Sequence, residues 1–195
     1  TQAKVLIIND VNKNNRAQVS AAYLALFKES KGGGLGIFTA ITRLRAVYED
    51  IYNKLGEKDI PLYAQHIDKM DTGTLTDIFR EDVKSCLLGT DALRDGVDVP
   101  GESLKLMIFD RVPWARPNIL HKARRKAFGE KSYDEMLTRM KLQQAFGRLI
   151  RRKDDKGIFI ILDGATPTKL LSAFPEGIEI QRIGLQDALK IVKKL

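Results

Sequence analysis

The chain has 195 residues, enough for one sizeable α/β domain and too few for two of ordinary size. Hydrophobic residues make up 44% of it, which excludes a wholly disordered chain, and no apolar run approaches the roughly 20 residues that span a bilayer. The 33 Lys and Arg residues outnumber the 25 Asp and Glu residues, for a formal net charge of +8. This excess favours a polyanionic partner such as nucleic acid, although an ordinary solvated basic surface gives the same total.

The first residues, TQAKVLIIND, have neither the basic region nor the cleavable apolar stretch of a secretory signal. They also lack an initiator Met, so we expect a piece of a longer protein. The single cysteine, Cys86, excludes an internal disulfide and any cysteine-ligated cluster held within this chain. These features fit a reducing, cytoplasmic location.

Short apolar segments alternate with longer amphipathic ones along the chain. The predicted strands are 4–8, 35–39, 60–64, 83–88, 104–109, 158–162 and 178–183. The predicted helices are about 16–28, 43–55, 73–80, 118–128, 132–150, 168–173 and 185–194. Strands that alternate with helices are joined by right-handed crossovers, and continuous apolar strands are covered on both faces. The sequence therefore predicts one α/β domain over residues 1–195, with a mainly parallel sheet flanked by helices.

A polar residue follows most of the predicted strands. These residues are Thr39, Gln65, Thr90 (after Gly89), Asp110 and Asp163. Ligands of open parallel sheets bind beyond the carboxyl ends of the strands, although such residues also serve as turn formers and helix caps. Because several of them fall at one edge, we expect that edge of the sheet to bind a ligand.

The predicted helix 132–150 begins with a capping-box pattern, in which Ser132 caps the helix and Glu135 reaches back to it. Its apolar positions can supply a buried face; they are Met136, Leu137, Met140, Ala145 and Leu149.

The same helix carries the pattern Q-x-x-G-R-x-x-R, formed by Gln144, Gly147, Arg148 and Arg151. The spacing i, i+4, i+7 predicts that the glutamine and both arginines share one helical face. Gly147 beside them lets a backbone or a phosphate approach closely, and a guanidinium can grip phosphate oxygens with two donors. The alternative is a solvated basic helix end, which the helix dipole favours. We expect this segment to lie at the ligand edge of the sheet.

The segment GTDALRDGVDVPG, residues 89–101, leaves a predicted strand and presents carboxylates around a glycine. Gly96 permits backbone geometry that other residues resist, and Asp95 and Asp98 can bind hydroxyls or order arginines. The alternative is a long polar turn, because Asp-Gly and Pro-Gly are common turn dipeptides.

Several other patterns do not indicate a site. KGGGLG, residues 31–36, follows a helix and enters a strand, so it is a helix end and turn rather than a phosphate loop. No G-x-x-x-x-G-K-[ST] occurs, so the chain alone should not bind and hydrolyse ATP by the P-loop route. His66 and His121 lack zinc spacing, and Cys86 belongs to a strand core. Trp114 either stacks on a base or packs on a neighbouring loop.

Five segments that occur in order resemble one family. They are IFTAITRL (37–44), YAQHID (63–68), GTDALRDGVDVPG (89–101), LKLMIFDRVPWARP (104–117) and QAFGRLIRRKDDKGIFIILD (144–163). Together they resemble the C-terminal motor domain of superfamily 2 DNA helicases of the DinG/XPD (Rad3-related) type. The resemblance is clearest over residues 34–163 and weaker over 1–33 and 164–195.

The resemblance implies a three-layer RecA-like domain of the P-loop NTPase type, which closes on ATP and Mg²⁺ held mainly by an N-terminal RecA-like domain. Gln144, Arg148 and Arg151 fall on the family's motif VI, and the resemblance gives them catalytic roles facing the triphosphate. Gly96 and Asp98 fall on motif V, and they and Gly147 are expected to contact the nucleotide. The resemblance assigns contacts with single-stranded DNA to Thr39, Arg43, Gln65 and Thr90.

Two positions depart from the family pattern. Ala40 stands where relatives often have Ser, and Asp95 stands where they usually have Glu. The iron–sulfur cluster of many relatives belongs to the other half of the enzyme, so we expect none in this chain.

Two other classes of function compete with a helicase motor. A stand-alone nucleic-acid adaptor with a RecA-like fold and no catalysis would also lack the P-loop, and Walker motifs upstream of Thr1 would exclude it. A Rossmann-type dehydrogenase or transferase needs a glycine fingerprint between a strand and a helix, which this sequence lacks.

Overall fold

The computed structural model describes all residues except 1, 92, 94–98, 100–102 and 117. One parallel sheet runs through the described part, with its strands in the order β3-β4-β2-β5-β6-β1-β7. The strands are β1 (Gln2–Ile8), β2 (Gly34–Phe38), β3 (Leu62–Ala64), β4 (Cys86–Thr90), β5 (Leu106–Phe109), β6 (Lys156–Ile161) and β7 (Glu179–Ile183). Every strand predicted from the sequence is present, and the parallel arrangement is confirmed.

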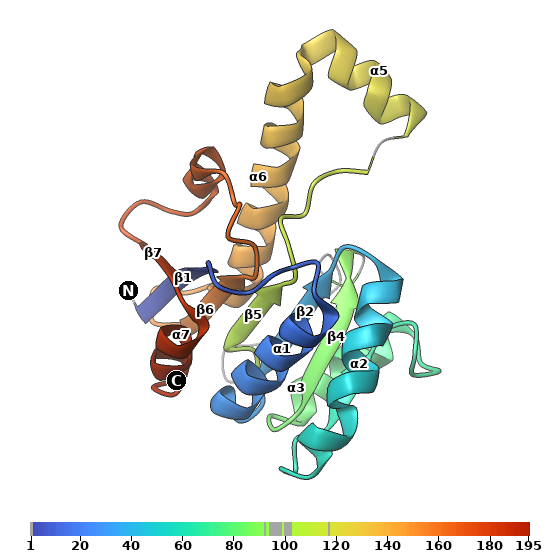
Figure 1. Ribbon diagram of the computed structural model, residues 1–195, viewed down its shortest axis with the longest axis vertical. Coiled ribbons are helices and arrows are strands. Elements are labelled where there is room, and N and C mark those ends of the chain that lie inside the picture. Colours follow the sequence, from blue (N-terminus) through green and yellow to red (C-terminus); the bar gives the residue numbers. More distant parts are fainter. Residues whose placement is uncertain (1, 92, 94–98, 100–102, 117) are drawn as a thin grey trace.

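Helices cover both faces of this sheet (Figure 1). One face carries α1 (Arg16–Ser30), α2 (Ile41–Gly56) and α7 (Leu185–Val192). The other carries α3 (Thr72–Glu81), α6 (Glu130–Leu149) and the short 3-10 helix η1 (Thr168–Ala173), while α5 (Ile119–Phe128) packs on the far end of α6. None of the helices in the described part is long and apolar enough to cross a membrane.

The central strands send alternate side chains into two hydrophobic cores, one on each face. In β5, Leu106 and Ile108 belong to the core under α1 and α2, while Met107 and Phe109 belong to the core under α6. Such strands are continuous in apolar residues because neither face meets water. The three-layer α/β fold predicted from the sequence is therefore confirmed.

The start of α6 differs from the prediction. The capping box at Ser132 and Glu135 is wrong, because α6 begins at Glu130, directly after Gly129, and no side chain caps it. Gly129 has a φ of 86°, which lets the chain turn from α5 into α6 without a separate loop.

The predicted buried face of this helix is also wrong over its first half. Met136 and Met140 are 43% and 48% exposed, whereas Ala145 and Leu149 are buried. The first turns of α6 extend beyond the sheet, as Figure 1 shows, and they bury Tyr133 and Thr138 instead of the two methionines, with the Tyr133 ring against His121 and Phe128 of α5.

The glycines of KGGGLG serve two purposes. Lys31 ends α1 in the left-handed conformation, as the predicted helix end and turn require, and the chain then enters β2. Within β2, a Cβ on Gly34 would lie 2.6 Å from the Phe27 ring, and one on Gly36 would lie 2.7 Å from Tyr23. These glycines let the aromatic side of α1 rest directly on the sheet.

We predict that Gly36→Ala lowers the free energy of unfolding by about 1–3 kcal/mol, because the added methyl group overpacks this core. Urea unfolding followed by far-ultraviolet circular dichroism measures the loss. Gly56→Ala at the end of α2 is the control, since a Cβ there meets none of the described residues within 4 Å, apart from its own helix. Equal stability of the two variants would contradict this account of β2.

Candidate nucleotide and nucleic-acid interface

The polar residues that follow the strands form one row along the carboxyl edge of the sheet. Since all the strands are parallel, the row runs in sheet order as Gln65, Thr90, Thr39, Asp110 and Asp163. The prediction that these residues share one edge is therefore confirmed. Their exposure and partners differ, and these decide which of them can meet a ligand.

Gln65 and Thr90 are bound to each other at one end of the row. The buried side chain of Gln65 accepts hydrogen bonds at Oε1 from the Thr90 amide, at 3.0 Å, and from the Thr90 hydroxyl, at 3.1 Å. Nε2 of His66 lies 3.3 Å from the same hydroxyl. Gln65 thus holds Thr90 in place, and Thr90 is the partly exposed member of the pair.

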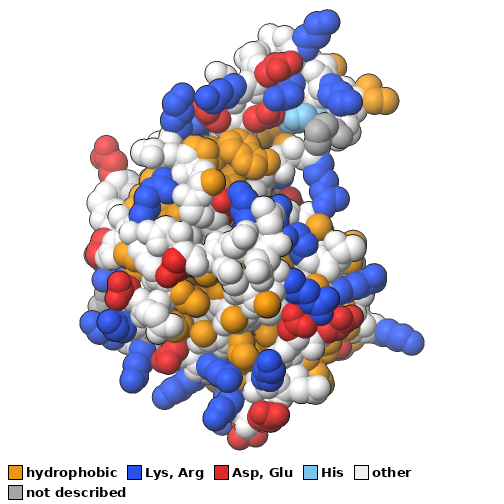
Figure 2. Space-filling view, viewed as in Figure 1, with side chains coloured by type: hydrophobic (Ala, Val, Ile, Leu, Met, Phe, Trp, Pro, Cys, Tyr) orange, Lys and Arg blue, Asp and Glu red, His pale blue; other side chains and the backbone are white. Residues whose placement is uncertain are grey.

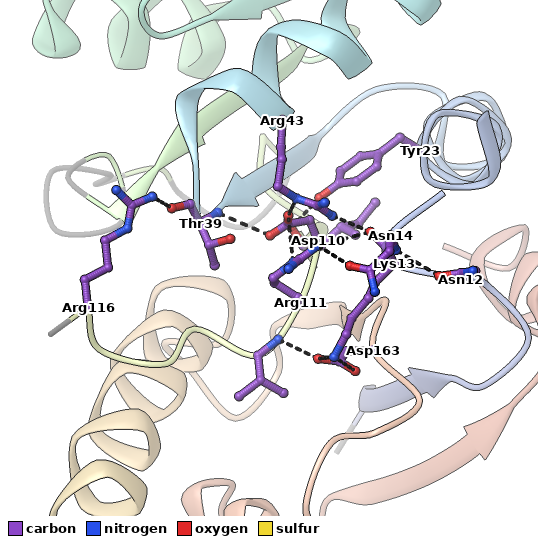
Figure 3. A network of polar contacts seen from close by, with 12 residues as sticks. Asn12, Lys13, Asn14, Tyr23, Thr39, Arg43, Asp110, Arg111, Arg116 and Asp163 are labelled. Carbon is purple, nitrogen blue, oxygen red and sulfur yellow. Dashed lines mark hydrogen bonds and ion pairs between the residues drawn. The ribbon is translucent and has the colours of Figure 1, made fainter. Parts of the chain in front are cut away.

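Asp110 is the central member of the row and is fully buried. Its Oδ1 accepts a hydrogen bond from the Thr39 amide at 3.2 Å, and its Oδ2 lies 2.6 Å from Nε of Arg43 (Figure 3). Arg43 also donates through Nη2 to the carbonyl of Lys13 at 2.7 Å. Arg43, predicted to contact DNA, is therefore engaged in an internal ion pair.

Burial raises the pKa of Asp110 above its ordinary value of 3.8, and the nearby Arg43 guanidinium opposes this rise. Burial also raises the pKa of Tyr23, whose hydroxyl donates to the carbonyl of Ile108 at 3.3 Å. The centre of the row is therefore a dry, low-dielectric site that is anchored to the core beneath α1.

The loop between β1 and α1 closes over the other end of the row. Nζ of Lys13 lies 2.8 Å from Oδ1 of Asp163, a buried carboxylate that also accepts from the Val112 amide at 3.2 Å. Arg111 donates to the Lys13 carbonyl at 3.1 Å. The sequence analysis gave no role to Lys13 or Arg111, although Arg111 lies in the segment 104–117 that carries the family resemblance.

The arginine-bearing segment lies elsewhere. The apolar residues at the C-terminal end of α6 pack on the core of the second face, and a Cβ on Gly157, at the start of β6, would lie 2.9 Å from the Leu149 side chain. The segment therefore runs across a face of the sheet toward its amino edge. The expectation that it lies at the carboxyl edge is wrong, because α6 returns the chain to the start of β6.

Gln144 and Arg148 lie one helical turn apart on α6, the first exposed and the second half-buried. Arg151 does not share their helical face as predicted, because α6 ends at Leu149 and Ile150 is extended. The Arg151 amide instead donates to Oδ2 of Asp155 at 2.8 Å, within the turn that leads into β6. Hydrogen bonding in this turn replaces another turn of helix.

Gly147 is exposed on α6, and among the described residues a Cβ there would meet no atom within 4 Å outside its own helical turn. By contrast, a Cβ on Gly89 would lie 2.1 Å from the Leu93 side chain, so Gly89 is required by packing inside this domain. The predicted residues Gly96 and Asp98, and the neighbouring Asp95, lie outside the described residues.

The fold and these motifs agree with one protein class. The family model of the helicase C-terminal domain matches residues 23–179. The chain belongs to this family, and it is a RecA-like α/β domain of the DinG/XPD type within superfamily 2.

Among curated proteins, the chain is 34% identical over 156 residues to the ATP-dependent helicase DinG of Mycobacterium tuberculosis, covering 76% of this chain and 23% of that protein. It is 31% identical over 164 residues to the 3′-5′ exonuclease DinG of Bacillus subtilis, covering 80% of this chain and 18% of that protein. The chain thus spans about a quarter or less of the length of these relatives.

Among solved structures, an XPD helicase matches 92% of this chain and 35% of its own chain, with a TM-score of 0.68 and 17% identity. The C-terminal domain of the DEAD-box protein Dbp5 matches 99% of this chain and 97% of its own, with a TM-score of 0.57 and 15% identity. At these identities the likeness concerns the fold alone.

The buried carboxylate at the centre of the row gives a pH-dependent prediction. Because the pKa of Asp110 is raised on folding, the free energy of unfolding falls as pH rises from the ordinary value of 3.8 through the folded value. Asp110→Asn removes this titration, so the stability of wild type relative to the variant should fall as pH rises through that interval.

Urea unfolding at a series of pH values measures this difference. Asp187→Asn, which changes an exposed carboxylate on α7, is the control. A stability difference for Asp110→Asn that stays constant from below 3.8 to neutrality would overturn the assignment.

Proposed function

We propose that this chain is the second motor domain of an ATP-dependent DNA helicase. In this proposal it supplies the arginine side of a composite ATP site and part of a track for single-stranded DNA. The observation that carries the proposal is Gly147, an exposed helical glycine beside Gln144 and Arg148, where an added Cβ would meet none of the described residues outside its own helical turn.

Glycine inside a helix costs about 1 kcal/mol relative to alanine, so a helical glycine without a packing role favours an external reason. A partner domain that presents a triphosphate is such a reason, because a phosphate can then approach the α6 backbone. Arg148 would hold phosphate oxygens, Gln144 would orient the group, and Arg151 would stabilise the charge that develops during transfer. Gly96 and Asp98 would complete the nucleotide contacts.

ATP and Mg²⁺ would be held mainly by the N-terminal RecA-like domain of the same protein, and the bound nucleotide would supply the phosphoryl group. This chain contributes cationic and polar side chains to the opposite wall. Their grip on the phosphates would draw the two domains together, and its loss would let them separate. Arg151 lies in a hydrogen-bonded turn after the helix. This position suits a side chain that would reach across the cleft between this domain and the proposed N-terminal domain.

The DNA track would follow the carboxyl edge of the sheet. Thr39 directly follows β2 and Thr90 ends the neighbouring strand β4, and the backbone amide of each donates to a buried partner, Asp110 and Gln65 respectively. Because both amides are already bound, the contacts with phosphate and sugar oxygens, which carry no sequence information, would fall to the two hydroxyls. Gln65 and Arg43 would act by positioning these contacts. The net charge of +8 favours the same polyanion.

We predict that Arg151→Ala in the full-length protein abolishes the stimulation of ATP hydrolysis by single-stranded DNA and leaves DNA binding measurable. Removal of a charge-stabilising arginine typically lowers the rate by about 10³-fold or more. Arg152→Ala, the exposed neighbour in the same turn, is the control. Unchanged stimulated hydrolysis in Arg151→Ala would exclude this role.

Gly147→Ala separates stability from activity. We expect the variant to be more stable by up to about 1 kcal/mol, since the methyl group has free space and favours the helix. Hydrolysis of ATP by the full-length variant should fall, because the methyl group blocks the approach of the partner domain. Thermal unfolding and an ATPase assay test the two halves, and a variant that is fully active would contradict the shared site.

Thr90→Val tests the track. We expect the affinity for single-stranded DNA to fall about 3- to 10-fold, the loss of roughly one hydrogen bond, while the side chain keeps its shape. Fluorescence anisotropy with a labelled oligonucleotide measures the change. Ser172→Ala, which removes an exposed hydroxyl from η1, is the control, and equal affinities would place Thr90 off the track.

A further inference from the structure

Trp114 is the only tryptophan of the chain, and 42% of its surface is exposed. Tryptophan is enriched at binding interfaces, where the ring covers apolar surface and the indole N–H meets a polar partner, so this exposed indole is a candidate contact. It follows β5 by five residues, in the segment that leads from the carboxyl end of this strand to α5, and Figure 1 shows α5 and the start of α6 projecting beyond that edge of the sheet.

The loop that carries Trp114 is held at both ends. Before the indole, the Val112 amide donates to Asp163 at 3.2 Å, and the Trp114 amide donates to the Val112 carbonyl at 2.9 Å. After it, Arg116 donates through Nη2 to the carbonyl of Thr39 (Figure 3). Hydrogen bonds therefore fix the loop to Asp163 and Thr39, two members of the polar row. A loop that is already ordered loses less conformational entropy when a ligand binds.

A hollow of about 350 Å³ opens beside the indole, within the range of about 300–1,000 Å³ that is usual for ligand sites. It is lined by Thr39, Asp91, Trp114, Ala115, Arg116, Asn118, His121 and Lys141. Figure 2 shows the surface hollowed between the projecting end of the molecule and its body. The wall of this hollow thus combines one exposed aromatic face with a residue of the proposed DNA track.

The charges around the hollow favour an anion. Two cations, Arg116 and Lys141, face one carboxylate, Asp91, which lies 3.2 Å from Nζ of Lys141. The adjoining helix α5, with the sequence ILHKARRKAF, has several basic residues and no acidic residue.

Trp114 also lines a second hollow, of about 710 Å³, on the side of Thr168 and Lys169. There the charges balance: Arg125, Lys131 and Lys169 stand against Glu130, Asp134 and Glu135. The phosphates of a nucleic-acid backbone are therefore attracted more strongly to the first hollow, which has a net positive charge, than to the second, which has none.

We propose that Trp114 is a stacking platform for one base of single-stranded nucleic acid, with the adjoining phosphates lying toward Arg116 and Lys141. This inference rests on the proposed DNA track and adds a base contact to it. Thr39 would contact the backbone of the strand, and the indole would take the base on the same side. Stacking on an aromatic ring tolerates every base, so the contact would hold the strand without reading its sequence.

The single tryptophan allows a direct test on the 195-residue chain, because intrinsic tryptophan fluorescence then reports on this side chain alone. The probes are an oligothymidylate and an abasic oligonucleotide of equal length and charge. We expect the oligothymidylate to quench the fluorescence and to bind more tightly than the abasic strand.

Trp114→Ala should lower the affinity for the oligothymidylate about 5- to 150-fold, the range expected for one stacked base. It should leave the affinity for the abasic strand unchanged, and Trp114→Phe should restore part of the loss. Tyr52→Ala, which removes an exposed aromatic ring from α2, is the control and should bind both strands as wild type does.

Equal affinity of wild type and Trp114→Ala for the oligothymidylate would overturn the inference. So would a fluorescence change that follows chain concentration and not DNA, because the indole would then be covered by a second copy. If Thr90→Val weakens the binding of both strands while Trp114→Ala weakens neither, the track stands and only the stacking platform fails. If the full-length protein binds neither strand, the proposed function itself fails.

Discussion

Burial of the Asp110 carboxylate directly after β5 constrains the carboxyl edge of the sheet from Thr39 to Asp163. A charge in so dry a place must be paired, and its two oxygens take the Thr39 amide and the Arg43 guanidinium. Arg43 in turn reaches the Lys13 carbonyl, and the Lys13 side chain reaches Asp163. One buried acid thereby joins loops that follow separate strands into a single rigid rim.

This rim and the arginine segment of α6 lie on different surfaces of the same domain. The rim follows the carboxyl edge, whereas Gln144 and Arg148 lie on a helix that covers a face and ends over the start of β6. The proposed function uses this separation, because in it one surface would meet a nucleotide while the other would hold the nucleic-acid strand. The shared β-sheet, close-packed on both faces, can transmit a displacement from one surface to the other.

Much of this could be predicted from the sequence because it depends on local patterns. Continuous apolar strands separated by amphipathic helices predicted a parallel sheet with two covered faces, and the row from Gln65 to Asp163 followed from strand polarity. The failures have physical causes as well. Ser132 does not cap α6 because Gly129 turns the chain earlier, and Met136 and Met140 are exposed because this part of the helix extends past the core. Helical spacing did not hold for Arg151, because hydrogen bonds to Asp155 end the helix.

The sequence by itself determined the fold class, the family and the residue types that the two proposed surfaces use. These features follow from the periodicity of the hydrophobic residues and from the order of the motifs along the chain. Only the tertiary structure decided which of those residues face outward. Arg43 and Gln65 carry polar groups that suit a ligand, yet each is bound inside the domain, while Trp114 is exposed on a loop held at both ends. The physical reason is that partners such as Lys13 and Asp163 are 150 residues apart in sequence, and folding alone brings them within reach.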